Sequence, residues 1–171
     1  LNVNDVTVDD VTVLASNDAQ TLQTRGQQKV RINGTNFGIK YGTNTSLQPE
    51  LVVRYGRLDK DRTTWFTATG CVLDNNGTEN TVVECDSAAG YGTAHVWNVE
   101  VRRLSTGERE GAADSFVTTS YFTPSVDSAV LADGGGAANA LNTSGGTRIK
   151  LIGTNFGPLG MPFEGYYSAG S

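Results

Sequence analysis

The chain has 171 residues, with 37% hydrophobic and 18% charged side chains, a formal net charge of −5 and a pI near 4.8. This length allows one complete hydrophobic core and part of a second. The acidic balance argues against nucleic acid as a partner, since nucleic-acid binders normally present a basic face. No apolar run approaches the roughly 18 residues of a membrane-spanning helix, so we expect no membrane insertion in this segment.

The composition indicates a β-protein. The 21 glycines exceed the usual share of about 7%, while Leu and Met are sparse and Val and Thr are abundant. Strand-like runs recur every roughly 8–12 residues with turn signals between them, which favours an all-β fold of the sandwich type. The sequence shows neither an initiator Met nor a signal peptide, so we expect a processed mature chain or a fragment.

Residues 1–14 alternate apolar and polar side chains around a break at Asp9-Asp10. This alternation predicts one or two edge strands. Asp5, Asp9 and Asp10 could collect a calcium ion together with backbone oxygens. No spaced ligand loop accompanies them, and solvated charges on an edge strand explain them better.

A strand followed by a Gly-Thr-Asn-Phe-Gly turn occurs twice, at residues 30–38 and again at residues 149–157. Glycine at both ends of the turn indicates positive φ angles, or backbone that passes too close for a side chain. The aromatic residue can then fold back over the core. These features indicate a structural role rather than a catalytic one, so we treat the turn as a marker of the fold. Its residues in the two copies are Gly34, Asn36, Phe37, Gly38, Gly153, Asn155, Phe156 and Gly157.

Residues 50–56 form the next predicted strand, and basic side chains cluster around its end. Acidic residues at positions 59 and 61 are interleaved with this cluster. A phosphate-binding patch is one interpretation, and a solvated strand edge is the ordinary one. The basic residues are Arg54, Arg57, Lys60 and Arg62.

The two cysteines, Cys71 and Cys85, flank a segment that contains Asn76-Gly77. Asn-Gly between strand-like runs is a strong hairpin signal. A hairpin would bring the cysteines side by side, which predicts a disulfide that stabilises the fold by roughly 3 kcal/mol. Two buried free thiols are the alternative. A zinc site is disfavoured because no nearby His or second Cys pair completes a ligand set.

Residues 94–103 form the longest predicted strand, in which His95, Trp97, Val99 and Val101 share one face. His95 is the only histidine. A core or interface histidine is the better interpretation than a general base. The sequence contains no nucleophile elbow, metal-binding His pair or phosphate loop, so we expect neither enzymatic activity nor a cofactor.

The repeated turn also sets the expected domain boundary. The Gly- and Ala-rich stretch 133–140 resembles a linker in composition, but in the repeat it corresponds to a loop inside the first unit. The junction is therefore expected near Pro124, where proline ends a strand. This gives a first domain at residues 1–121 and an incomplete second domain at residues 122–171.

Four triplets match the acceptor pattern for N-glycosylation. Two or three such triplets would arise by chance in a chain this rich in Ser and Thr. Together with the predicted disulfide they favour an extracellular or cell-surface protein that carries N-linked glycans. The acceptor residues are Asn33, Asn44, Asn76 and Asn142.

These motifs resemble the IPT/TIG family of immunoglobulin-like domains, found in plexins, other cell-surface receptors and some transcription factors. The family's opening signature is similar to residues 145–157, and residues 26–38 carry a looser form of it. Its Val-x-Phe-Gly strand resembles residues 52–56, and its paired-cysteine hairpin resembles Cys71 to Cys85. The segment 116–124 resembles its domain ending. The resemblance covers nearly all of the first domain and the first third of a second.

The resemblance implies an immunoglobulin-like β-sandwich in tandem repeats, without enzymatic activity. One departure is that residues 87–89 lack the prolines usual after the second cysteine, so the resemblance does not give the shape of this loop. The transcription-factor branch of the family is disfavoured by the acidic charge and the glycosylation triplets.

We therefore expect a structural module, a glycosylated building block of a surface protein or extracellular filament. Its partners would be neighbouring IPT/TIG domains or copies of itself, and residues 1–14 could donate a strand to a neighbour. The alternative is a receptor or adhesin ectodomain that binds a protein or a carbohydrate. In that case exposed aromatic side chains would stack on sugar rings, with these candidates: Trp65, Tyr91, Trp97, Tyr166 and Tyr167.

Overall fold

The computed structural model describes residues 2–8, 21–37, 49–73, 81–103, 105–161 and 164–167, and it confirms an all-β fold. A single turn of 3-10 helix, η2 (Arg62–Thr64), interrupts the strands in these ranges. None of the helices in the described part of the chain is long and apolar enough to cross a membrane. The strands are β1 (Asn2–Val8), β2 (Thr21–Leu22), β3 (Lys29–Thr35), β4 (Glu50–Gly56), β5 (Phe66–Thr67), β6 (Thr69–Leu73), β7 (Val82–Asp86), β8 (His95–Arg102), β9 (Arg109–Tyr121), β10 (Ser125–Leu131) and β11 (Ile149–Thr154).

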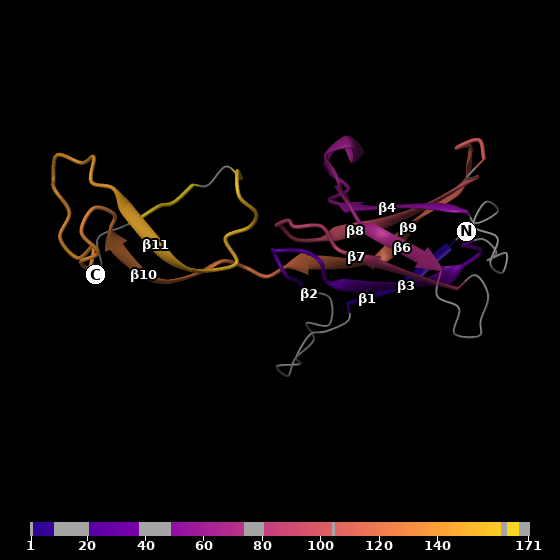
Figure 1. Ribbon diagram of the computed structural model, residues 1–171, viewed down its shortest axis with the longest axis horizontal. Coiled ribbons are helices and arrows are strands. Elements are labelled where there is room, and N and C mark those ends of the chain that lie inside the picture. The colour runs from indigo at the N-terminus through magenta and orange to yellow at the C-terminus, as the bar shows by residue number, and fades with distance from the viewer. Residues whose placement is uncertain are drawn as a thin grey trace.

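Nine strands form one sheet in the order β5-β4-β8-β9-β1-β3-β7-β6, with β2 paired to β9 off this path. In Figure 1, β4 and β8 lie in the upper part of this body, and β1, β3 and β7 lie in the lower part. The long strand β9 joins the two parts, because it pairs antiparallel with β8 and parallel with β1 and β2. The core lies between them, where residues of β4 and β8 meet residues of β3 and β7.

Strand β8 follows the alternation that the sequence predicts. His95, Trp97, Val99 and Val101 are all buried, while Glu100 and Arg102 are partly exposed. The opposite face is more enclosed than alternation alone implies, because Asn98 is also buried. Its amide donates a hydrogen bond to Asp114 Oδ1 on the neighbouring strand, at 2.7 Å. This bond satisfies a polar group that would otherwise be costly to bury.

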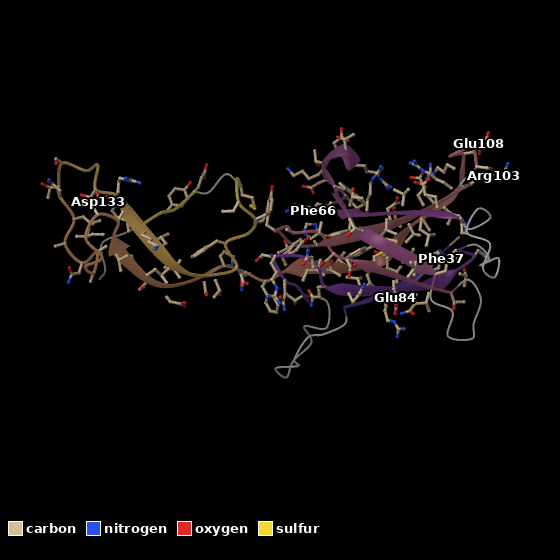
Figure 2. The ribbon with its side chains drawn as sticks, viewed as in Figure 1. Phe37, Phe66, Glu84, Arg103, Glu108 and Asp133 are labelled. Carbon is tan, nitrogen blue, oxygen red and sulfur yellow. A yellow bond between two sulfur atoms is a disulfide. The ribbon has the colours of Figure 1, made fainter. Side chains whose placement is uncertain are left out.

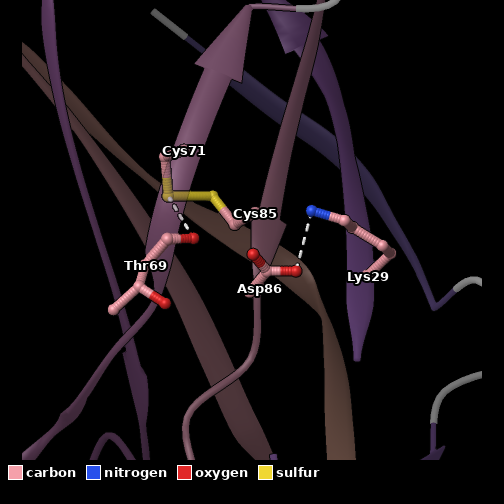
Figure 3. Close-up of a disulfide and its surroundings, with 5 residues drawn as sticks. All are labelled: Lys29, Thr69, Cys71, Cys85 and Asp86. Carbon is pink, nitrogen blue, oxygen red and sulfur yellow. Dashed lines mark hydrogen bonds and ion pairs between the residues drawn. A yellow bond between two sulfur atoms is a disulfide. The ribbon is translucent and has the colours of Figure 1, made fainter. Parts of the chain in front are cut away.

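The disulfide between Cys71 and Cys85 is present, as the hairpin signal predicted. It joins β6 to β7, which pair antiparallel with a bulge between Thr69 and Val72. Figure 3 shows the bond beside the ion pair between Lys29 and Asp86, whose charged atoms are 2.8 Å apart. The tip of the predicted hairpin, including Asn76, lies outside the described residues.

The expectation that residues 1–14 form an edge is wrong for β1. This strand lies between β3 and β9 in the sheet, pairing with β3 along its length and with β9 at Val3 and Ser115. Alternation reports which face of a strand is buried but not which strands flank it. Val3 is fully buried. Residues 9–14 and the proposed calcium ligands Asp9 and Asp10 lie outside the described residues, as does the side chain of Asp5.

A second hairpin, β10 with β11, forms a separate two-stranded sheet that repeats the pairing of β1 with β3. In the first hairpin Val3 faces Gly34, and in the second Val126 faces Gly153. Each hairpin has a bulge directly after that valine, followed by four further pairs in the same register. The repeated sequence motif therefore corresponds to a repeated piece of structure. Its second copy begins with β10 at Ser125, directly after Pro124.

The conformation of the repeated turn differs in one respect from the expectation based on glycine. In both copies the asparagine has the positive φ, 63° at Asn36 and 59° at Asn155, which Asn tolerates better than most residues. Gly153 is required for the other reason, since a Cβ there would collide with the Ser125 carbonyl oxygen. Gly157 has a φ of 87°, and Gly38 lies outside the described residues.

The aromatic residue of the turn differs in burial between the copies. Phe37 is fully buried in the core of the nine-stranded body, and Figure 2 shows it near one end of that body. Phe156, its equivalent, is only partly buried. The first turn therefore contributes to a complete core, whereas the second lies on a sheet of two strands.

Candidate functional site

A hollow of about 310 Å³ opens where β4 ends and β8 begins. Figure 2 places Phe66 at the end of the nine-stranded body opposite Phe37, on the side toward β10 and β11. Four aromatic rings and two basic side chains line the hollow: Trp65, Phe66, Tyr91, His95, Arg57 and Lys60.

Glycine at position 56 allows this hollow to form. A Cβ on Gly56 would lie 2.5 Å from the ring of Trp65, so the indole packs directly on the backbone where β4 ends. The indole Nε1 then donates a hydrogen bond to the Arg57 carbonyl at 3.1 Å. The side chain of Asp61 accepts from the Thr63 amide at 2.8 Å and begins η2. These contacts hold the loop around Trp65 in one shape.

Tyr91 provides the accessible ring of the hollow. Its side chain is 48% exposed, and its ring meets Phe66 edge-to-face with the centroids 5.9 Å apart. Phe66 in turn contacts His95 edge-to-face at 5.6 Å. Trp65 is nearly buried. The hollow therefore presents one open aromatic ring supported by two others.

His95 holds the loop that carries Tyr91. The histidine is buried, and its Nε2 lies 3.0 Å from the Tyr91 carbonyl oxygen, to which it donates. Burial lowers the pKa of His95, so the ring is neutral at pH 7. Its Nδ1 has no hydrogen-bond partner among the described residues. The histidine therefore acts as a packed aromatic ring with one hydrogen bond to the backbone.

A closed set of hydrogen bonds fixes the loop that follows the second cysteine. The Ala88 amide donates to Tyr55 Oη at 2.9 Å, and Tyr121 Oη donates to the Ala88 carbonyl at 2.8 Å. The two tyrosine oxygens are 2.6 Å apart, which completes the circuit. Burial raises the pKa of both phenols. These bonds define the shape of a loop that lacks the prolines of the IPT/TIG pattern.

The basic cluster at the rim is already largely paired. Arg57 makes two hydrogen bonds to Asp59, at 2.8 and 2.9 Å, which raise the pKa of Arg57 and lower that of Asp59. Arg62 bonds to Asp114 at 2.6 Å and lies over the Trp65 ring at 4.9 Å. Among the described residues no carboxylate lies within ion-pair distance of Lys60. Lys60 is therefore the available cation at this rim, rather than one member of a phosphate-binding cluster.

The glycosylation triplets lie in different environments. Asn33 is half-buried on the face of β3 opposite Ile32, and Ile32 is fully buried. Asn142 is exposed, and its side-chain oxygen accepts hydrogen bonds from the Ser144 amide at 3.1 Å and hydroxyl at 2.9 Å. Asn44 and Asn76 lie outside the described residues.

Two of the five aromatic candidates for sugar stacking, Trp65 and Tyr91, line the hollow, and the other three do not. Trp97 is fully buried and stacks on Tyr55 with the centroids 4.0 Å apart, so Trp97 cannot face a ligand. Tyr166 and Tyr167 are exposed, and neither lines the hollow. Sequence analysis named Trp65 and Tyr91 but could not place them in one hollow with Phe66 and His95, because these rings come from separate strands and loops. The signal that could have indicated it is Tyr91 between two glycines in a polar segment.

No group of three His, Cys, Asp or Glu side chains in the described ranges is placed to hold a metal ion. No family model, curated protein or solved structure matches this chain.

Proposed function

We propose that this chain is a non-enzymatic structural module of an extracellular protein, built from tandem immunoglobulin-like β-sandwich domains of the IPT/TIG type. The observation that carries the proposal is the second hairpin, in which β10 and β11 repeat the register and the bulge of β1 and β3. Repeated units of this kind are typical of chains that act as spacers or as building blocks of a larger assembly.

Two further observations support an extracellular location for this protein. The disulfide between Cys71 and Cys85 is of the kind that persists in oxidising compartments. Asn142 is exposed, and Asn33 lies on the face of β3 opposite the core, so glycans on these residues would not displace core side chains. The partners of such a module are neighbouring domains of the same type or further copies of the chain.

The test is direct examination of the native material. Electron microscopy should show a regular fibre or rod, and a non-reducing gel should show faster migration than a reducing gel. Treatment with an N-glycosidase should lower the mass to that of the polypeptide alone, of which these 171 residues contribute 18.1 kDa. An intracellular protein without glycan and without the disulfide would contradict the proposal.

The hollow at Tyr91 favours a second function, recognition of a carbohydrate by a receptor or adhesin. An open aromatic ring can stack on the apolar face of a sugar, and Lys60 at the rim would favour a sugar that carries a carboxylate or sulfate. A glycan array tests this function, with Tyr91→Ala as the variant and Tyr166→Ala as a control of equal chemistry away from the hollow. Saturable binding that only Tyr91→Ala removes would support this alternative, and the absence of any saturable binding would remove it.

A further inference from the structure

The second hairpin exposes the side chains that its first copy buries. Val126 is 57% exposed, Ile149 is 37% exposed and Leu151 is 38% exposed. Their equivalents in the first copy, Val3, Val30 and Ile32, have no exposed surface. Within the described residues β11 pairs with β10 alone, so its outer edge is open. An open edge beside an exposed apolar face is a template for another strand.

The first copy shows which kind of strand this edge accepts. The outer edge of β3 pairs with β7, which runs antiparallel from Val82 to Asp86. Two ion pairs link the strands on the face away from the core. Arg31 Nε lies 2.7 Å from Glu84 Oε1, and Lys29 Nζ lies 2.8 Å from Asp86 Oδ1. The strand on β3 therefore carries an acidic residue opposite each basic one.

The second copy keeps both basic positions. Arg148 stands at the position of Lys29, and Lys150 stands at the position of Arg31. The described partner of Arg148 is Asp133, at 4.0 Å, and both side chains are 80% exposed. Among the described residues no carboxylate lies within ion-pair distance of Lys150. The edge of β11 thus has the charges of β3 without the acidic strand that neutralises them.

We propose that the outer edge of β11 binds an extended polypeptide strand that runs antiparallel to it and carries acidic side chains at alternate positions, as β7 does. This inference rests on the proposed function, because it treats β10 and β11 as a second unit of the same design. The bound strand adds main-chain hydrogen bonds to β11. Its acidic side chains face Arg148 and Lys150, and its apolar side chains extend the face formed by Val126, Ile149 and Leu151.

Charge disfavours a second copy of β11 as the occupant. Two identical strands related by a twofold axis pair antiparallel and bring Arg148 and Lys150 of both copies onto one face of the sheet. Like charges on neighbouring strands destabilise such a pair. Strand β1 is also a poor donor, because it pairs with β3 along its length and Val3 is fully buried in the core of its own sheet.

The experiment titrates the 171-residue chain with two peptides and follows the backbone amides by NMR. The acidic peptide copies residues 81–87 with Cys85→Val, and the control peptide adds Glu84→Lys and Asp86→Lys. The acidic peptide should shift the amides of residues 149–154 and bind about tenfold more tightly than the control, since two cross-strand ion pairs distinguish them. The variant Lys150→Glu should weaken this preference, and Arg109→Glu, an exposed residue of the nine-stranded sheet, should leave it unchanged.

Three results would overturn the inference: equal binding of both peptides or of neither, amide shifts confined to another strand, or dimerisation through β11 without peptide. The last result would identify a second copy as the occupant. Failure here is distinguishable from failure of the proposed function. A regular extracellular fibre together with no preference between the peptides removes this inference alone. A clear preference in a protein that is never secreted removes only the proposed function.

Discussion

At the scale of single residues, His95 connects the hollow to the core. Its ring contacts Tyr55 and Tyr121 edge-to-face, with centroids 6.0 and 5.5 Å apart, while Nε2 holds the Tyr91 carbonyl. Burial lowers the pKa of His95, so the charged form is disfavoured in the folded protein. The unfolded chain has no such constraint, and its histidine titrates near the ordinary value of about 6.5.

We therefore expect stability to fall on acidification below about pH 6.5. In that range the unfolded state binds a proton that the folded state does not, which favours unfolding until the pH drops below the lowered pKa. Urea unfolding at pH 7.5 and pH 5.5 checks this, with His95→Gln as the variant. Because His95 is the sole histidine, the variant should lose most of the dependence in this interval. If the free energy of unfolding changed equally between the two pH values in both proteins, His95 would be excluded as the cause of the pH dependence.

Gly56 is the second residue with a sharp consequence. A Cβ there meets the Trp65 ring at 2.5 Å, so Gly56→Ala should destabilise the fold by about 1–3 kcal/mol and change the fluorescence of Trp65. Gly136→Ala is the matched control, since a Cβ at Gly136 meets nothing within 4 Å. Equal stability of the two variants would show that the indole does not pack on the backbone of Gly56.

At the scale of elements, the hairpin of β6 and β7 depends on its disulfide. The bond closes a loop with a sequence separation of 14, for which chain entropy gives about 3 kcal/mol. Urea unfolding with and without reductant should show that reduction lowers the free energy of unfolding by this amount. The double variant Cys71→Ala/Cys85→Ala should be equally destabilised and indifferent to reductant. A midpoint that reductant does not move in the wild type would show that the bond contributes little.

The two repeated hairpins provide an internal comparison of burial. Ile32→Ala removes a fully buried side chain and should cost about 2–5 kcal/mol. Leu151→Ala, at the equivalent position, removes a partly exposed one and should change stability by about 0.5 kcal/mol or less. Far-UV circular dichroism during urea unfolding follows both sheets. A similar loss in both variants would mean that Leu151 is covered in solution.

At the scale of the whole molecule, the nine-stranded sheet and the β10–β11 sheet share no strand pairing among the described residues. The two units meet at a hollow lined by Gln23, Thr24, Arg25, Thr154 and Asn155, and a Cβ on Gly157 would lie 3.9 Å from the Cβ of Tyr91. A chain of residues 1–124 should therefore unfold within about 0.5 kcal/mol of the full chain, measured by the fluorescence of its two tryptophans. A large drop in the midpoint would show that the second hairpin stabilises the first unit.

Part of this architecture could be predicted from residue patterns alone. The alternation in β4 and β8, the hairpin signal between the cysteines and the repeated turn predicted strands and a disulfide that are all present. The edge position expected for β1 was wrong, because a strand's neighbours depend on chain topology. Strand β2 was not predicted, since its two residues are too few to show a period.

The sequence by itself determined the all-β class, the disulfide and the existence of a repeat, because these depend on local periodicity, turn chemistry and direct comparison of residues. Only the tertiary structure decided which strands lie side by side, which aromatic rings are buried, and how Tyr91 meets Phe66 and His95 in one hollow. Only the pairing of β3 with β7 showed that Arg148 and Lys150 occupy positions that face acidic residues in the first copy. Such contacts join residues far apart in the chain, and the backbone must be folded before they exist.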